Sequence, residues 1–135
     1  MLMDTSTLIW WAGGHAALGP QAAAAIEEQG NAIFVSAVTS WEISIKRTIG
    51  KFGPVPDADI DHRRGSDVEW WMEQGLFEEL PVSARHGHVA GALPVHHRDP
   101  FDRLLVAQAQ VEGLVLLTPD AALRNYDVPV IDART

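Results

Sequence analysis

The sequence predicts an α/β protein with one parallel sheet of about five short strands, flanked by helices on both faces. Apolar runs of strand length alternate with helical patterns along the chain, which is typical of β-α-β units. The length of 135 residues is that of one domain, and 47% hydrophobic residues are enough to fill a core. No internal repeat or low-complexity tract divides the chain, so we expect a single domain over residues 1–135.

The first half of the chain is expected to hold two strands and the helices that follow them. The expected elements are strands at 1–3 and 32–35 and helices at 8–11, 20–30 and 37–49. Pro20 suits the first position of the second helix, and Gly50 suits the position just after the third. Residues 51–65 lack periodicity and contain glycines and prolines, so we expect a long loop there.

The second half is expected to alternate helices and strands in the same way. The expected elements are helices at 67–73, 83–93, 99–112 and 120–125 and strands within 77–82, at 114–117 and at 128–131. Ser83, Asp99 and Asp120 are suitable N-cap residues, because their side-chain oxygens can accept hydrogen bonds from first-turn N–H groups. Pro100 suits the first position of a helix, and Gly113 suits the residue after its end.

Composition and charge exclude several classes of site. The chain has no cysteine, which rules out disulfides, thiolate nucleophiles and cysteine-ligated zinc and fits a reducing cytoplasm. No apolar stretch approaches the roughly 18 residues of a membrane span, so we expect a soluble cytoplasmic protein without a membrane partner. The net charge of −8 argues against nucleic-acid binding through the overall field, but it allows a local basic patch and a basic partner.

Four carboxylates that are far apart in the chain fall where strands are expected to end or helices to begin: Asp4, Glu42, Asp102 and Asp120. The carboxyl ends of parallel strands meet at one edge of the sheet, where ligands bind. Carboxylates gathered there repel one another, and a divalent cation would neutralise them. Because hard oxygen donors suit Mg²⁺ or Mn²⁺, the pattern predicts the metal site of a small phosphodiesterase.

Each acid also has a structural interpretation. Asp4 and Asp120 could cap the helices that they precede, and Asp102 lies in a first helical turn, where the helix dipole favours an acid. Glu42 could close a capping box, but it lies on a largely apolar helix face, where a carboxylate is costly to bury unless it is paired or bound to a metal. The four together favour a site, because structural caps need not converge.

Other motifs are absent or ambiguous. The chain has no Gly-rich phosphate loop, no Gly-x-Ser-x-Gly and no His-Glu-x-x-His, so P-loop ATP hydrolysis, serine hydrolase chemistry and that type of zinc site are not expected. The adjacent His96 and His97 could ligate a metal, although histidines on an irregular segment more often face solvent. Lys46, Arg47 and Arg103 are near site acids in sequence, and we interpret them either as phosphate contacts or as solvated surface charges.

Four segments occur in an order shared with a known family. They are DTSTLIWW at 4–11, SAVTSWEISIK at 36–46, DPFDRLLVAQA at 99–109 and LLTPD at 116–120. Together they resemble the PIN-domain toxins of the VapC type over essentially the whole chain. The resemblance implies a PIN-like parallel sheet and an Mg²⁺- or Mn²⁺-dependent ribonuclease, the toxin of a bacterial type II toxin–antitoxin pair. It also implies inhibition by a small VapB-type antitoxin and assembly as a homodimer.

The resemblance assigns roles residue by residue. It implies metal-site acids at Asp4, Glu42, Asp102 and Asp120, with Thr5 or Ser6 and Thr118 orienting them and Asp99 in support. Asp4 and Asp102 would ligate the ion directly, and the other two acids would act through water or a second ion. Ser6 stands where close relatives often have histidine. A metal-activated water would hydrolyse phosphodiesters of single-stranded or looped RNA.

Three alternative functions are compatible with acids at the top of a sheet. A phosphoacceptor signalling domain needs an adjacent acidic pair early in the chain, but Asp4 has no acidic neighbour. An aspartate-nucleophile phosphatase needs Asp-x-Asp after the first strand, where Ser6 takes the third place. A catalytically silent partner-binding module, in which the acids only cap helices, stays open.

Overall fold

The computed structural model describes residues 1–49 and 67–135 and contains a five-stranded parallel sheet. The strands are β1 (Leu2–Met3), β2 (Phe34–Ser36), β3 (Glu78–Leu80), β4 (Leu116–Thr118) and β5 (Val130–Asp132). Their order across the sheet is β3-β2-β1-β4-β5, and every neighbouring pair is parallel. The predicted α/β class with a parallel sheet is confirmed.

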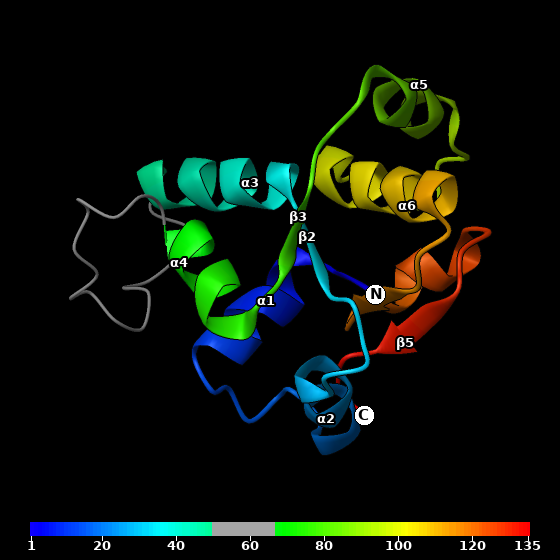
Figure 1. The fold of residues 1–135 in the computed structure, drawn as a ribbon. Coiled ribbons are helices and arrows are strands. Elements are labelled where there is room, and N and C mark those ends of the chain that lie inside the picture. The colour runs from blue at the N-terminus through cyan, green and yellow to red at the C-terminus, as the bar shows by residue number, and fades with distance from the viewer. Residues whose placement is uncertain (50–66) are drawn as a thin grey trace.

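In residues 1–49 and 67–135, six α-helices and one 3₁₀ helix connect and cover these strands (Figure 1). They are α1 (Thr5–Ala12), α2 (Pro20–Glu27), α3 (Ala37–Thr48), α4 (Asp67–Gly75), α5 (Ala84–Ala92), α6 (Pro100–Glu112) and η2 (Ala121–Asn125). Ser36, Ser83, Asp99 and Asp120 are N-caps whose side chains accept first-turn N–H bonds. Because Ser36 caps α3, Glu42 has no capping role and is free for another one.

Element boundaries differ from the predicted ones by a few residues. The first helix begins at Thr5 rather than Leu8, because Asp4 caps it. The three strands predicted from apolar runs at 32–35, 114–117 and 128–131 each begin two residues later and end one residue later. The predicted helix end at Gly50 and the loop over 51–65 lie outside the described residues.

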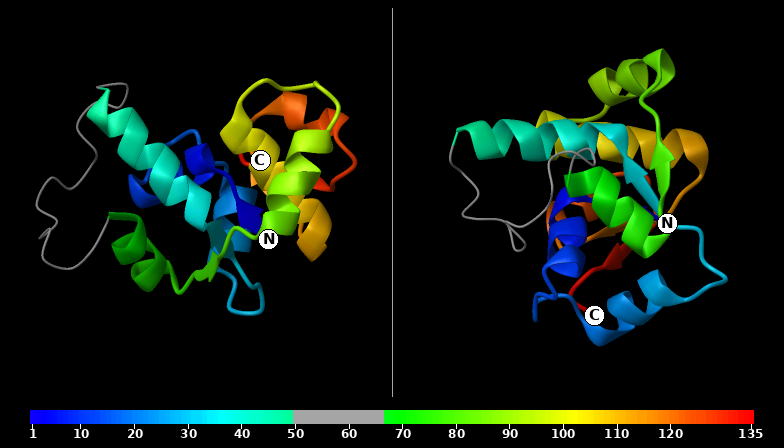
Figure 2. Two further views of the ribbon diagram at one scale, coloured as in Figure 1. Left: turned by 90° about the horizontal axis from the view of Figure 1, so that it is seen from above. Right: turned by 60° about the vertical axis from the view of Figure 1, so that its left-hand side comes forward.

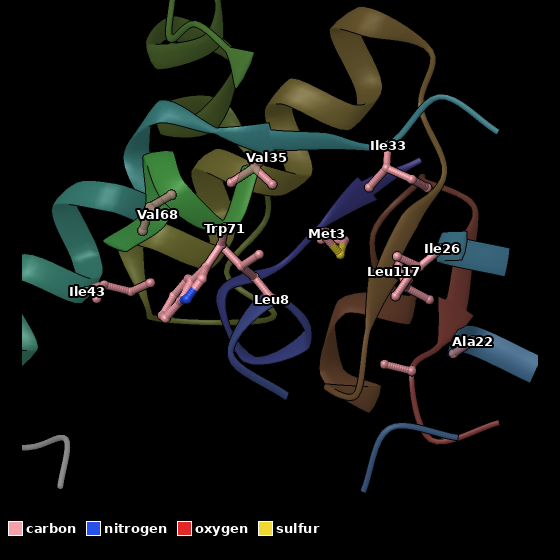
Figure 3. Packing of buried hydrophobic residues seen from close by; sticks show 11 residues of the cluster. Met3, Leu8, Ala22, Ile26, Ile33, Val35, Ile43, Val68, Trp71 and Leu117 are labelled. Atoms are coloured by element: carbon pink, nitrogen blue, oxygen red, sulfur yellow. The ribbon is translucent and has the colours of Figure 1, made fainter. Parts of the chain in front are cut away.

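The sheet is covered on both faces, and the alternation along each strand decides which side chain joins which core. Met3 and Leu117 belong to one cluster with residues of α1, α2 and α4, which Figure 3 shows from close by. Leu2 and Leu116, their direct neighbours in sequence, belong to the other cluster with residues of α6 and η2. All four side chains are fully buried, and burying each contributes roughly 1.5–3 kcal/mol to the stability of the sheet.

The strand order places a ligand-binding position next to the middle strand. From β1 the chain builds outward through β2 and β3, and then continues on the other side of β1 with β4 and β5. The order therefore reverses between β1 and β4, where open α/β sheets bind ligands. Helices α3 and α6 lie beside this position, and Trp41 packs edge-to-face on Phe101 with ring centroids 5.4 Å apart.

Helix α5 lies outside α6, on the side away from the sheet (Figure 2). His86 caps it together with Ser83, and its Nε2 lies 2.9 Å from Glu112 Oε1 at the end of α6. In the described ranges, 1–49 and 67–135, no helix is long and apolar enough to cross a membrane.

The end of α6 gives a test of the backbone assignment. Gly113 has φ 67 and ψ 37, the left-handed region, and a Cβ there would meet no atom within 4 Å. We expect Gly113→Ala to lower the free energy of unfolding by about 1 kcal/mol through backbone strain alone. Gly87 within α5 also has open space, and Gly87→Ala should instead raise it by about 0.5–1 kcal/mol. Urea denaturation of both variants measures these changes, and equal effects would contradict the assignment.

Candidate metal centre

Asp4 is the most constrained acid of the site. It follows β1 directly and caps α1, and its side chain is 4% exposed. The backbone N–H of Thr7 donates to its Oδ1 at 2.8 Å, and the hydroxyl of Thr118 donates to its Oδ2 at 2.5 Å. Both carboxylate oxygens are therefore held in place by residues of α1 and β4.

Thr118 joins Asp4 to the fourth acid. Its Oγ1 donates to Asp4 and accepts a hydrogen bond from the backbone N–H of Asp120 at 3.1 Å. Asp120 caps η2, because its Oδ1 accepts from Ala122 N at 2.9 Å. One hydroxyl thus sets the relative position of the acids after β1 and β4.

Glu42 reaches the site from α3. It is 2% exposed, and the hydroxyl of Thr5 donates to its Oε1 at 2.6 Å. Lys46, one turn later on the same helix, forms an ion pair with Oε2. The charge of Glu42 therefore has a cationic partner from its own helix.

Asp99 and Asp102 have different environments although both lie at the start of α6. Asp99 caps the helix, and its Oδ1 accepts from Phe101 N at 2.8 Å. The carboxylate of Asp102 has a single polar partner among the described residues, His97, whose Nε2 lies 3.4 Å from Oδ2. Asp102 is thus the acid of the site with the least compensation for its charge.

The electrostatics of the metal-free site follow from this arrangement. Burial raises the pKa of Asp102 to about 7, and the carboxylates of Asp99, Asp4 and Glu42 add to the effect, whereas His97 opposes it. Burial also raises the pKa of Asp4, although the hydrogen bonds from Thr118 and Thr7 oppose this. The carboxylates of the site therefore outnumber its cationic partners, and Lys46 pairs with Glu42. The oxygen donors of the site and this charge deficit fit a hard divalent cation such as Mg²⁺ or Mn²⁺.

His97 is part of the site, and the sequence left it ambiguous. Its Nε2 lies 2.8 Å from Asp120 Oδ2, and His97, Asp102 and Asp120 offer one ligand atom each within 4.8 Å of one another. Its position two residues before the N-cap Asp99 could have indicated that it lies beside the acids at the start of α6. Thr7, whose backbone N–H donates to Asp4, was also not predicted from the sequence. An N-cap side chain commonly accepts from the N–H three residues later, so this contact was predictable.

The predicted supporting residues divide into two groups. Thr5 and Thr118 hydrogen-bond the acids as described above. Ser6 does not, because its side chain is exposed and no hydrogen bond joins it to an acid in the described part of the chain.

The three predicted phosphate contacts already have protein partners. Lys46 pairs with Glu42, and Arg47 pairs with Asp67 of α4. The guanidinium of Arg103 donates to backbone carbonyls of the segment before α6, with three distances of 3.0 Å, to Ala90, Leu93 and Pro94. Arg103 therefore holds that segment on α6, and its guanidinium is engaged by backbone carbonyls.

The fold and the four acids define an α/β domain with an acidic centre at the carboxyl ends of its strands. The family model of the PIN domain matches residues 1–129, so the chain belongs to the PIN domain family. A search of curated protein sequences gave no match.

Several solved structures share this fold. VapBC2 from Rickettsia felis, bound to a DNA fragment from its promoter, is 13% identical with a TM-score of 0.66, and the match covers 97% of this chain and 96% of the other. FitAB bound to the IR36 DNA fragment is 17% identical with a TM-score of 0.63, covering 99% and 95%. FitAcB from Neisseria gonorrhoeae is 18% identical with a TM-score of 0.61, covering 98% and 96%. At these identities, the likeness shows the fold.

The raised pKa of Asp102 predicts how the metal-free protein responds to pH. In the unfolded chain the pKa of this carboxyl is near its ordinary value of 3.8, but burial raises it to about 7 in the folded protein. Between these values the folded state binds more protons, so its stability falls as pH rises from about 4 through 7, by on the order of a few kcal/mol. Asp102→Asn removes this loss and should melt above the wild type at pH 8 in EDTA, with the difference vanishing near pH 4.

The exposed Asp127 supplies the matched control for this measurement. Asp127→Asn also exchanges a carboxyl for an amide and should keep the wild-type dependence of melting temperature on pH. A difference between Asp102→Asn and the wild type that is the same at pH 4 and pH 8 would show that Asp102 is not a destabilising buried charge.

Proposed function

We propose that this protein is a metal-dependent endoribonuclease and the toxin of a type II toxin–antitoxin pair. The observation that carries the proposal is the poorly compensated carboxylate of Asp102 beside Asp4 and Glu42 in a PIN domain. A carboxylate with a purely structural role would form an ion pair or cap a helix, as Asp99 does. A cation site needs instead a carboxylate whose charge is left for the ion.

The residues of the site would hold Mg²⁺ or Mn²⁺ and fix its ligands. Bound there, such an ion lowers the pKa of a water molecule and neutralises charge on a phosphodiester. Asp4 and Asp102 are the proposed direct ligands. Thr118 and Thr7 keep the carboxylate of Asp4 in one orientation through their hydrogen bonds. Glu42 and Asp120 would act through water or a second ion.

The proposed substrate is single-stranded or looped RNA. Unstacked segments reach a recessed acidic site more easily than a duplex does. The net charge of −8 gives no general attraction to RNA, so local basic groups must compensate for it. Lys46 is the basic side chain at the acids themselves, and we propose that it contacts the phosphate when the cation takes over the charge of Glu42. Arg47 is a second, weaker candidate beside it.

The proposed partner is a VapB-type antitoxin, and the proposed assembly is a cytoplasmic homodimer that binds it. The resemblance to VapC-type toxins and the fold shared with VapBC2 and FitAB support the partner. A cavity of about 410 Å³ lies between α1, α2 and α4, with Trp11, Ile26 and Phe77 in its apolar part and Glu27 and Glu28 at its acidic part. Such a lining fits a basic amphipathic segment.

The cleavage reaction tests the proposed function directly. Purified protein should cleave labelled single-stranded RNA in millimolar Mg²⁺ or Mn²⁺ and not in EDTA. Asp102→Asn should fold and lose at least about 100-fold in rate, because the amide is a poor ligand for the ion. The outcome that contradicts the proposal is cleavage that is unaffected by EDTA, or no cleavage of any RNA; the latter would favour the catalytically silent module.

Asp99 supplies the matched control three residues away in the same helix. Asp99→Ala removes the cap and should lower the free energy of unfolding by about 1 kcal/mol. It should leave Mg²⁺-dependent cleavage within a few-fold of the wild type. If Asp99→Ala abolishes cleavage while Asp102→Asn retains it, the two roles are exchanged.

A further inference from the structure

The imidazole ring of His97 is held by the backbone at the start of α6. The N–H of Asp99 donates to its Nδ1 at 3.0 Å. This N–H belongs to the N-cap residue, whose position is fixed by its own bonds to the first turn and by Pro100 after it. The main chain of His97 is held as well, because its N–H donates to the hydroxyl of Tyr126 at 2.9 Å.

These contacts decide which ring nitrogen carries the proton. A neutral imidazole has one N–H donor and one acceptor nitrogen. Because Nδ1 of His97 accepts from Asp99, the proton is on Nε2. Nε2–H is directed at two site carboxylates, with Asp120 Oδ2 at 2.8 Å and Asp102 Oδ2 at 3.4 Å.

This tautomer differs from that of a histidine that binds a metal. A ligating imidazole gives the ion a lone pair, and its other nitrogen donates a proton to a carboxylate or carbonyl. For His97 to ligate through Nε2, its proton would have to move to Nδ1, where it would face the N–H of Asp99. Two donors would then oppose each other, and the site would lose a hydrogen bond.

We propose that His97 is a positioning residue that holds Asp120 and Asp102 through Nε2–H and is not itself a cation ligand. This inference rests on the proposed divalent-cation site. Asp120 is then fixed at both oxygens, since Oδ1 accepts from Ala122 N. Asp102 is held through Oδ2 only, which leaves its remaining lone pairs available for the ion. The ligand set consists of oxygens alone, which suits Mg²⁺.

The tautomer can be measured on the unmodified protein. Long-range ¹H–¹⁵N NMR spectra distinguish Nε2–H from Nδ1–H, and Mg²⁺ is diamagnetic, so both states are observable. We expect His97 to be the Nε2–H form without Mg²⁺ and with saturating Mg²⁺. An Nδ1–H form in either state overturns the inference. His96 is the internal reference, because its ring is exposed and has no hydrogen bond among the described residues.

Two substitutions test the effect on ion binding. His97→Leu removes the donor and should weaken Mg²⁺ binding by about 10-fold or more, while His97→Gln keeps an N–H near the Nε2 position and should restore most of the affinity. The matched His96→Leu should bind Mg²⁺ like the wild type. Equal losses in the Gln and Leu variants, with unchanged melting temperatures, overturn the positioning role.

Ion selectivity separates positioning from ligation. An imidazole ligand binds Ni²⁺ far more strongly than it binds Mg²⁺. If His97 only positions the acids, His97→Leu lowers the affinities for Ni²⁺ and Mg²⁺ by the same factor. A much larger loss for Ni²⁺ identifies His97 as a ligand and overturns the inference. A wild-type protein that binds neither ion counts against the proposed function, and the NMR tautomer still decides the contact of His97 with the two acids.

Discussion

The hydrogen bonds of Asp4 hold together the parts of the protein on which the site depends. A buried carboxylate is stable only when its oxygens are satisfied, and here the donors come from α1, through Thr7, and from β4, through Thr118. β1 has two residues and is the middle strand, paired with both β2 and β4. Asp4 therefore lies at the end of the central strand of the sheet. Because Thr118 also accepts from Asp120 N, the same network places the acid after β4.

The acids of the site are compensated to different degrees, and this difference supports the proposed cation site. Glu42 has Lys46 and Thr5, and Asp120 has its helix cap and His97. Asp102 is left with one long contact, and its pKa is raised to about 7. The buried charge of Asp102 destabilises the metal-free protein, and a cation that binds there would offset this loss of stability. The stability of the metal-free protein and the proposed ion binding therefore both depend on Asp102.

Local chemistry was predictable from the sequence, and long-range packing was not. The caps Ser83, Asp99 and Asp120 follow from residue types next to periodic segments, and the proximity of the acids after β1 and β4 follows from strand ends that meet at one edge. The role of His97 could not be predicted, because it depends on how the segment before α6 folds back. Arg103 holds that segment through its carbonyls, which explains why this basic residue is structural. The pKa of Asp102 likewise depends on burial by distant elements.

If divalent cations bind the folded site through Asp102, the melting temperature at pH 8 depends both on the cation and on this side chain. At about 100 times its Kd, an ion that binds only the folded state adds about 2.7 kcal/mol of stability, which raises the Tm by roughly 5–10 °C for a domain of this size. We expect such a rise for the wild type in Mg²⁺ and little or none for Asp102→Asn. An unchanged wild-type Tm, or an equal rise in both proteins, would contradict it.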